Sequence, residues 1–274
     1  MQRRMKMANP KSVPYVKQNA SGGLYWKGKW SYQGIPNTQI GRKGSRIYRI
    51  QGSGCGLCST AMALYFCTGK FTYPSEFRGK YNPGAGSSRD IGMYYGKKQG
   101  VKVEATNDWD MVDKALKKGA VVMAIMGKSV WTRAGHFILI TGKVGNKYSV
   151  NDPASKKRSY LFTKKLWSKS QIHTYSKKYA PKDKDGNIIF AAYTIFWPIL
   201  KLPTATVKKG GSGENVRRVQ QILTYLGLYS GEIDSNAGVK TEAAIKAFQK
   251  KHNLGVDGSF GPVCRLKVKE LIKK

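Results

Sequence analysis

The sequence predicts an α+β chain of two domains, in which a larger mixed domain is followed by a small all-α domain. Before residue 203, short apolar runs alternate with helical periodicities, whereas after residue 211 only amphipathic helices follow. Between them lies a stretch rich in Pro, Thr, Gly and Ser without periodicity, which is typical of a linker. We therefore expect domains at 1–203 and 211–274, joined by a linker at 204–210, and 274 residues suffice for two such domains.

The larger domain is predicted to contain two helices and several strands. Residues 54–66 are nearly all apolar, so the helix they form must be buried. Residues 110–118 carry apolar side chains at the spacing of one helix face. The expected strands are 121–125, 136–141, 148–151 and 188–197.

The small domain is predicted to hold three helices. The first spans 214–226, the second begins at Thr241 as a plausible N-cap, and the third spans 262–272 with Pro262 in its first turn. Two loops of the form Asp-x-x-x-Gly, at 234–238 and 257–261, make a weak internal repeat, and each precedes a helix.

The formal net charge of +34 is the most unusual bulk feature. It favours a polyanionic partner such as nucleic acid, an anionic membrane or a cell wall rich in phosphate polymers, although a solvated lysine surface is the plainer alternative. Residues 206–274 hold 13 Lys/Arg and 6 Asp/Glu, a net +7, so +27 lies on the rest of the chain. We expect neither a membrane span nor a signal peptide, because no run of about 20 apolar residues occurs and no hydrophobic stretch follows the basic residues 1–6.

Cys55 has the sequence environment of a nucleophile. It opens the buried helix after a glycine-containing loop, and a helix N-terminus favours a thiolate and offers free N–H groups. Cys58 lies one turn further in, and we expect Cys58, Cys67 and Cys264 to be buried apolar groups in a chain made in a reducing cytoplasm.

The string Cys55-Gly-Leu-Cys58 leaves a redox or zinc site as an alternative, but no second pair completes a zinc site, so we predict no metal. Residues 183–187 resemble a calcium loop with its Gly too early, and a turn is the better prediction.

His136 is the best candidate base among the three histidines. It follows a glycine and opens an apolar strand. His173 instead lies in a polar stretch rich in Lys and Ser, and His252 lies in the small domain. A strand at 148–151 that pairs with this one would bring Asp152 or Asn151 close enough to orient the ring. Gln51 is a candidate side-chain donor to an oxyanion.

The motifs around these residues resemble papain-like peptidases related to the double-glycine leader peptidases of bacteriocin exporters. The resemblance covers about 13–160 and rests on the segments 54–62, 135–142 and 150–153. It implies Cys55 as nucleophile, His136 as base and Asp152 as orienting group, with no cofactor. Gln18 is a second candidate for the oxyanion donor.

The small domain resembles the peptidoglycan-binding domain of many wall hydrolases, on the segments 213–223, 231–234, 238–249 and 256–261. This resemblance implies a set of wall-contacting residues in the two loops and the second helix. They are Asp234, Gly238, Phe248, Gln249, Asp257, Gly258 and Gly261.

Together the two halves predict a peptidoglycan hydrolase of the phage endolysin type, which cleaves an amide bond of the wall peptide. Its expected partners are bacterial peptidoglycan, anionic wall polymers or an outer-membrane surface, and a holin-like pore that releases it from the host cytoplasm; no specific nucleic acid is expected. Two alternatives stay open: a peptidase that cuts a protein at a double glycine, and a non-catalytic wall- or nucleic-acid-binding protein.

Overall fold

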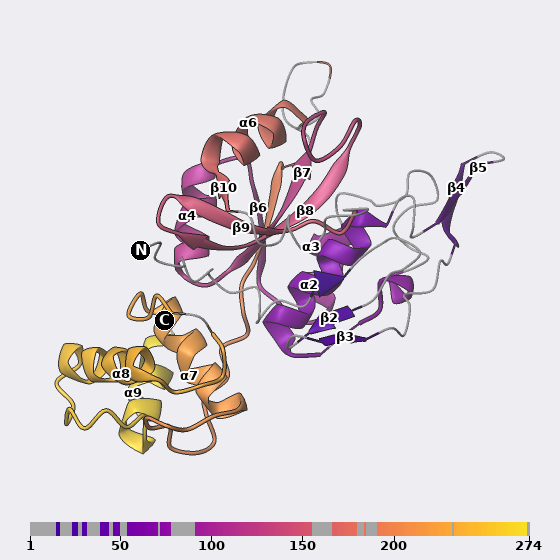
Figure 1. The fold of residues 1–274 in the computed structure, drawn as a ribbon. Helices are drawn as coiled ribbons and strands as arrows, with labels where there is room; N and C mark the ends of the chain where they lie inside the picture. Colours follow the sequence, from indigo (N-terminus) through magenta and orange to yellow (C-terminus); the bar gives the residue numbers. More distant parts are fainter. Residues whose placement is uncertain are drawn as a thin grey trace. The chain divides into compact units, whose positions relative to one another are not determined.

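The structure is a computed structural model that describes residues 15–16, 24–26, 29–31, 39–43, 46–49, 54–70, 72–77, 91–154, 166–179, 184, 191–231 and 233–272. The chain divides into two compact units, one formed mainly by residues 1–198 and the other mainly by residues 199–274 (Figure 1). No helix within these described ranges is long and apolar enough to cross a membrane.

A six-stranded antiparallel sheet forms the centre of the first unit, in the order β10-β9-β8-β7-β11-β6. Its strands are β6 (Val103–Thr106), β7 (Val121–Met126), β8 (His136–Val144), β9 (Lys147–Asn151), β10 (Trp167–Ser168) and β11 (Tyr193–Phe196). The strands predicted at 121–125, 136–141 and 148–151 are confirmed; the predicted strand 188–197 is shorter, and residues 185–190 lie outside the described ones. Five short strands precede the sheet: β1 (Tyr15–Val16), β2 (Leu24–Trp26), β3 (Lys29–Ser31), β4 (Gln39–Lys43) and β5 (Arg46–Arg49).

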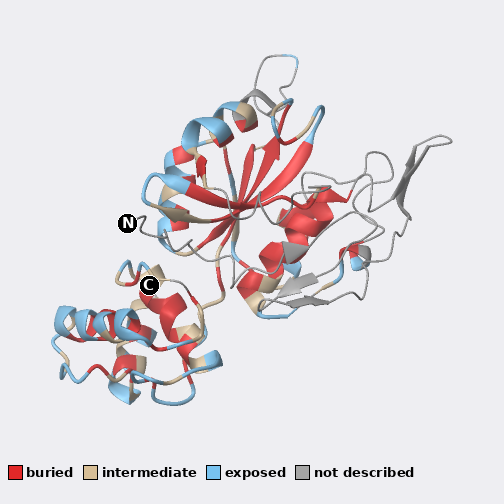
Figure 2. Ribbon diagram, in the orientation of Figure 1, coloured by how far each residue is buried: buried red, intermediate tan, exposed pale blue. Residues whose placement is uncertain are grey.

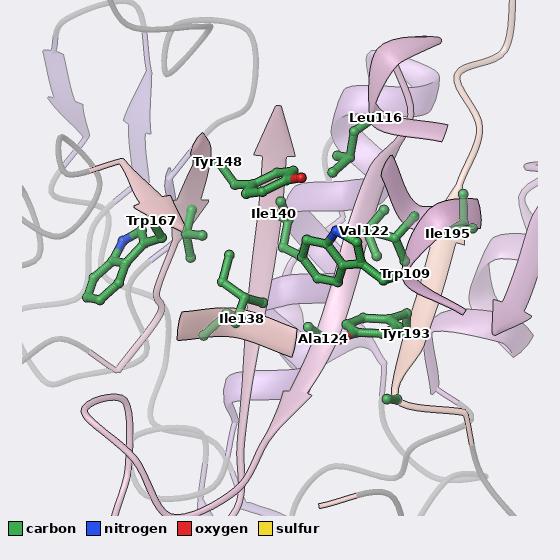
Figure 3. Packing of buried hydrophobic residues seen from close by; sticks show 14 of the residues in the cluster. Trp109, Leu116, Val122, Ala124, Ile138, Ile140, Tyr148, Trp167, Tyr193 and Ile195 are labelled. Atoms are coloured by element: carbon green, nitrogen blue, oxygen red, sulfur yellow. The ribbon is translucent and has the colours of Figure 1, made fainter. Parts of the chain in front are cut away.

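One face of this sheet is covered by α4 (Trp109–Lys117) and α6 (Lys169–Tyr179). Alternate residues of β7 and β8, among them Val122 and Ile140, point into a buried cluster with the rings of Trp109 and Tyr193 (Figure 3). Helix α4 agrees with the helix predicted at 110–118. Helix α6 was missed, because its sequence is mostly polar and its first eight residues bury only Ile172 and Ser176.

The other face is covered by α2 (Cys55–Thr68) and α3 (Ile91–Lys98), with the 3-10 turn η1 (Pro74–Glu76) beside α2. Helix α2 is buried along almost its whole length, as its apolar sequence predicts (Figure 2). It ends at Gly69, whose left-handed conformation lets its N–H bond to the carbonyl of Tyr65. Helix α3 approaches the sheet closely at Gly92, where a Cβ atom would lie 2.7 Å from the Phe196 ring.

The second unit holds α7 (Glu214–Tyr225), α8 (Val239–Lys251) and α9 (Pro262–Ile272) around one apolar core. The expected N-cap at Thr241 is wrong: α8 begins two residues earlier behind Gly238, and the Thr241 hydroxyl instead accepts a hydrogen bond from Gln220. The predicted linker also differs from a free spacer, because Val207 is buried in this core and its backbone pairs with Phe260.

Candidate active site

Three of the predicted residues meet at one end of the strands β8 and β9. Cys55 is the first residue of α2, His136 is the first of β8, and Asp152 directly follows β9. Because β8 and β9 are antiparallel neighbours, the start of β8 and the end of β9 lie side by side at the same end of the sheet. Helix α2 packs against β8. His136 Nε2 lies 2.6 Å from Asp152 Oδ1, and the Cys55 side chain is hydrogen-bonded to His136.

The structure places Asp152 rather than Asn151 against the imidazole. The Asp152 carboxylate also accepts the backbone N–H of Ala154 at 2.9 Å, which fixes its orientation in the turn after β9. Asn151 instead donates to the sulfur of Met62 in α2. Since successive residues of a strand point to opposite faces, only the register of β8 with β9 could decide between them.

Cys55 has a pKa below the ordinary value of a thiol. Burial would raise the pKa, but the hydrogen bond and the positive charge of His136 outweigh it, together with the backbone N–H groups of Phe137 and Gly56. The Gly56 group belongs to the first turn of α2, where N–H groups have no partner within the helix. These donors favour the thiolate form of Cys55.

His136 shows the complementary shift. Burial would lower its pKa, but the hydrogen bonds to Asp152 and Cys55, with their negative charges, raise the pKa to about 10. Because Nε2 faces Asp152, Nδ1 is the nitrogen that remains for Cys55. The side chains of His136 and Asp152 are only 5% and 6% exposed, so this pair is shielded from water. A thiolate–imidazolium pair oriented by a carboxylate can carry out nucleophilic attack on an acyl carbon.

The donors for an oxyanion are only partly visible. Gln51 and Gln18 both lie outside the described residues, so their roles stay predictions. Sequence reasoning missed the backbone N–H of Phe137 as a partner of the sulfur, and no residue pattern signals it, because it depends on how closely β8 approaches α2.

The remaining cysteines are buried, and the other two histidines make contacts of their own within their units. Cys58, Cys67 and Cys264 are buried, as predicted. His173 on α6 is hydrogen-bonded to the Tyr193 hydroxyl at 2.8 Å, and the ring of His252 packs against Phe248 in the second unit. Among the described residues, no three His, Cys, Asp or Glu side chains gather as a metal site would need.

One of the predicted wall-contacting residues of the second unit, Gln249, is a buried glutamine that holds one of the two Asp loops. Gln249 donates to Asp257 Oδ1 at 2.6 Å and to the carbonyl of Ser259, and it accepts the N–H of Gly258. Gly258 has a φ of 74°, a conformation that favours glycine. This amide therefore fixes the first three residues of the loop, Asp257 to Ser259.

The other loop of the repeat has the same arrangement. Gln220 of α7 donates to Asp234 Oδ1 at 2.9 Å and to the carbonyl of Asn236, and it accepts the N–H of Ser235, whose φ is 65°. The internal repeat is thus a repeated contact in which a buried glutamine holds an Asp loop. The sequence does not single out Gln220, because it looks like an ordinary helix residue and its partners lie in a distant loop. Phe248 is fully buried in the core. Direct contact of this set with peptidoglycan stays a prediction, and Phe248 can act only through the packing of the domain.

Comparison with known families assigns a Peptidase_C39-like domain followed by a helical peptidoglycan-binding domain. Residues 11–180 match the Peptidase_C39 like family, to which the chain belongs. Residues 212–265 match a peptidoglycan binding domain family.

The chain is also similar to individual proteins. The spore cortex-lytic enzyme of Bacillus cereus is 38% identical over 68 residues, which are 25% of this chain and 25% of that enzyme. The chain thus spans about a quarter of the length of the curated relatives it matches. Among solved structures, the SleB N-terminal domain is 32% identical over 26% of this chain and 97% of its own, with a TM-score of 0.25. A C39-like peptidase from Bacillus anthracis is 11% identical over 59% of this chain and 96% of its own, with a TM-score of 0.39.

Proposed function

We propose that the chain hydrolyses an amide bond in the peptide part of bacterial peptidoglycan, with Cys55 as nucleophile. The observation that carries this proposal is the Cys55–His136–Asp152 arrangement in a chain that also holds a peptidoglycan-binding domain. The family supports a cysteine peptidase, and the second domain supports a wall substrate.

The first half of the reaction follows from the charges of the site. The Cys55 thiolate attacks the carbonyl carbon of the amide, and backbone N–H groups at the start of α2 are the available donors to the developing oxyanion. The proton on His136 Nδ1 then moves to the leaving amine, while Asp152 keeps the ring in place through Nε2. The products of this half are a free amine and a thioester on Cys55.

The second half regenerates the thiolate. Once the amine has left, His136 is neutral and can take a proton from a water molecule that attacks the thioester. The carbon–sulfur bond breaks, the carboxylic acid is released, and the proton retained on His136 restores the ion pair with Cys55.

Purified peptidoglycan tests this proposal directly. Cys55→Ala should abolish the release of soluble fragments, whereas Cys58→Ser and Cys58→Ala should keep substantial activity, because Cys58 is fully buried and takes no part in the steps above. Mass spectrometry of the fragments should show new amine and carboxyl ends at one peptide position. Full activity in Cys55→Ala contradicts the proposal.

Assays of wall binding and of peptide cleavage separate the alternatives. Binding of walls without any cleavage supports a non-catalytic wall protein, and cleavage of a double-glycine peptide with no action on walls supports a protein-processing peptidase.

We further propose that the charge of +34 holds the enzyme on anionic wall polymers. A separate experiment tests the endolysin role. Co-expression with a holin-like pore should lyse cells, and expression without the pore should not.

A further inference from the structure

Cys58 is a nucleophilic group that the proposed mechanism does not use. It lies one helical turn after Cys55 in α2, and its N–H donates to the carbonyl of Gly54 at 2.9 Å in the first hydrogen bond of that helix. Cys55 is 9% exposed, whereas Cys58 is fully buried. Cys55 is therefore the more accessible of the two to a small oxidant from solvent.

The positions of the two cysteines are compatible with a disulfide. Residues three apart in a helix have Cα atoms about 5 Å apart, which lies within the range of about 4.4–6.8 Å seen in disulfides. Their Cβ atoms, about 5–6 Å apart in a regular helix, must approach to about 4 Å. Cys55 is the first helical residue and has glycines at 54 and 56, so the backbone of the first turn of α2 has the conformational freedom for this adjustment.

We propose that Cys55 and Cys58 form a reversible disulfide when the enzyme meets hydrogen peroxide, and that this modification switches off the nucleophile while protecting it from irreversible oxidation. The proposal rests on the proposed function only in taking Cys55 as the reactive thiolate. It does not depend on which amide bond the enzyme cleaves.

The first step oxidises Cys55. Its thiolate attacks one oxygen of hydrogen peroxide, the O–O bond breaks, and a sulfenic acid forms on Cys55 while hydroxide leaves. The sulfur loses two electrons and the peroxide gains them. The imidazolium of His136, which is hydrogen-bonded to Cys55, supplies the proton that converts the hydroxide to water.

The second step closes the disulfide. The Cys58 sulfur attacks the sulfur of the sulfenic acid, the S–S bond forms, the S–O bond breaks, and the departing hydroxide takes up the Cys58 proton as water. Burial, and the negative charge of Cys55, raise the pKa of Cys58 well above its ordinary value in the reduced enzyme. The sulfenic acid is neutral, so the contribution of the Cys55 charge disappears at the moment when Cys58 has to react.

The two other cysteines provide controls within the same chain. Cys67 lies nine residues beyond Cys58 in α2, a rise of about 13 Å along the helix, and it is buried with a raised pKa. Cys264 is in the second unit. Cys67 cannot reach Cys55 within the folded first unit, and Cys264 is enclosed in the core of the second unit. The raised pKa values of both thiols make them poor targets for peroxide.

The experiment treats the full-length protein with an excess of hydrogen peroxide, because a sulfinic acid consumes two peroxide molecules for each thiolate, and it follows mass and activity. The wild type should lose the mass of two hydrogens and yield a proteolytic peptide with Cys55 linked to Cys58. Its activity on peptidoglycan should disappear and return with dithiothreitol. Cys58→Ser and Cys58→Ala should instead gain the mass of two oxygens on Cys55 and stay inactive after dithiothreitol, while Cys67→Ser should behave like the wild type.

A wild type that accumulates the sulfinic acid on Cys55 to the same extent as Cys58→Ala, with no linked peptide, overturns the proposal. The linked peptide is measured on the wild type, so this conclusion does not depend on the folding of any variant. Formation of the disulfide in a protein that leaves peptidoglycan intact contradicts the proposed function and leaves this inference standing. Cleavage of peptidoglycan by a protein that forms no disulfide supports the proposed function and contradicts this inference.

Discussion

Replacement of Asp152 by Asn tests how the site keeps His136 charged. The carboxylate lies 2.6 Å from Nε2 in a buried environment, and its hydrogen bond is the largest single contribution that raises the pKa of His136 to about 10. Asn can still accept a hydrogen bond from the ring, so the orientation of His136 should survive while the negative charge is lost. The change therefore separates the two contributions of Asp152.

The magnitude follows from the strength of such a contact. A hydrogen bond to a charged group contributes about 1.5–3 kcal/mol, and about 1.4 kcal/mol corresponds to one pKa unit. The alkaline limb of kcat/KM should lie near pH 10 in the wild type and about 1–2 pH units lower in Asp152→Asn. Activity requires the protonated imidazole, so the loss should be modest at neutral pH and grow about tenfold for each pH unit above the new limb.

The assay is the pH dependence of kcat/KM on a soluble wall peptide. Asp113→Asn is a matched control, because Asp113 is another partly buried carboxylate with close partners, the Lys143 ammonium and the Tyr148 hydroxyl, but it lies on α4 across the sheet from α2. Its profile should coincide with that of the wild type. An alkaline limb that stays near pH 10 in Asp152→Asn refutes the assignment of Asp152 as the group that keeps His136 protonated.

Three further predictions address the rest of the structure. His136→Ala should be about as damaging as loss of Cys55, whereas His173→Ala should keep most activity on purified peptidoglycan; the reverse order contradicts the choice of base. Gly92→Ala should lower the free energy of unfolding in urea by about 1–3 kcal/mol, because its Cβ would clash with the Phe196 ring, while exposed Lys97→Ala should stay within about 0.5 kcal/mol of the wild type. Wall binding by residues 1–205, which carry most of the net charge, should weaken with salt more steeply than binding by the small domain; a flat salt dependence excludes a role of the charge in wall residence.

The sequence by itself determined the features that local patterns encode. The apolar run after Gly54 had to be a buried helix, so the position of Cys55 at its start followed without any knowledge of the fold. Likewise, the periodicities after residue 211 predicted three helices, of which only the start of the second was misplaced.

The tertiary structure decided everything that depends on distances across the chain. The register of β8 with β9 placed Asp152 beside His136 and turned Asn151 towards α2. The Phe137 N–H reaches the Cys55 sulfur only because β8 packs against α2. Gln220 and Gln249 look like ordinary helix residues in the sequence, yet both are buried and hold the two Asp loops, because a buried amide must find partners wherever the packing brings them.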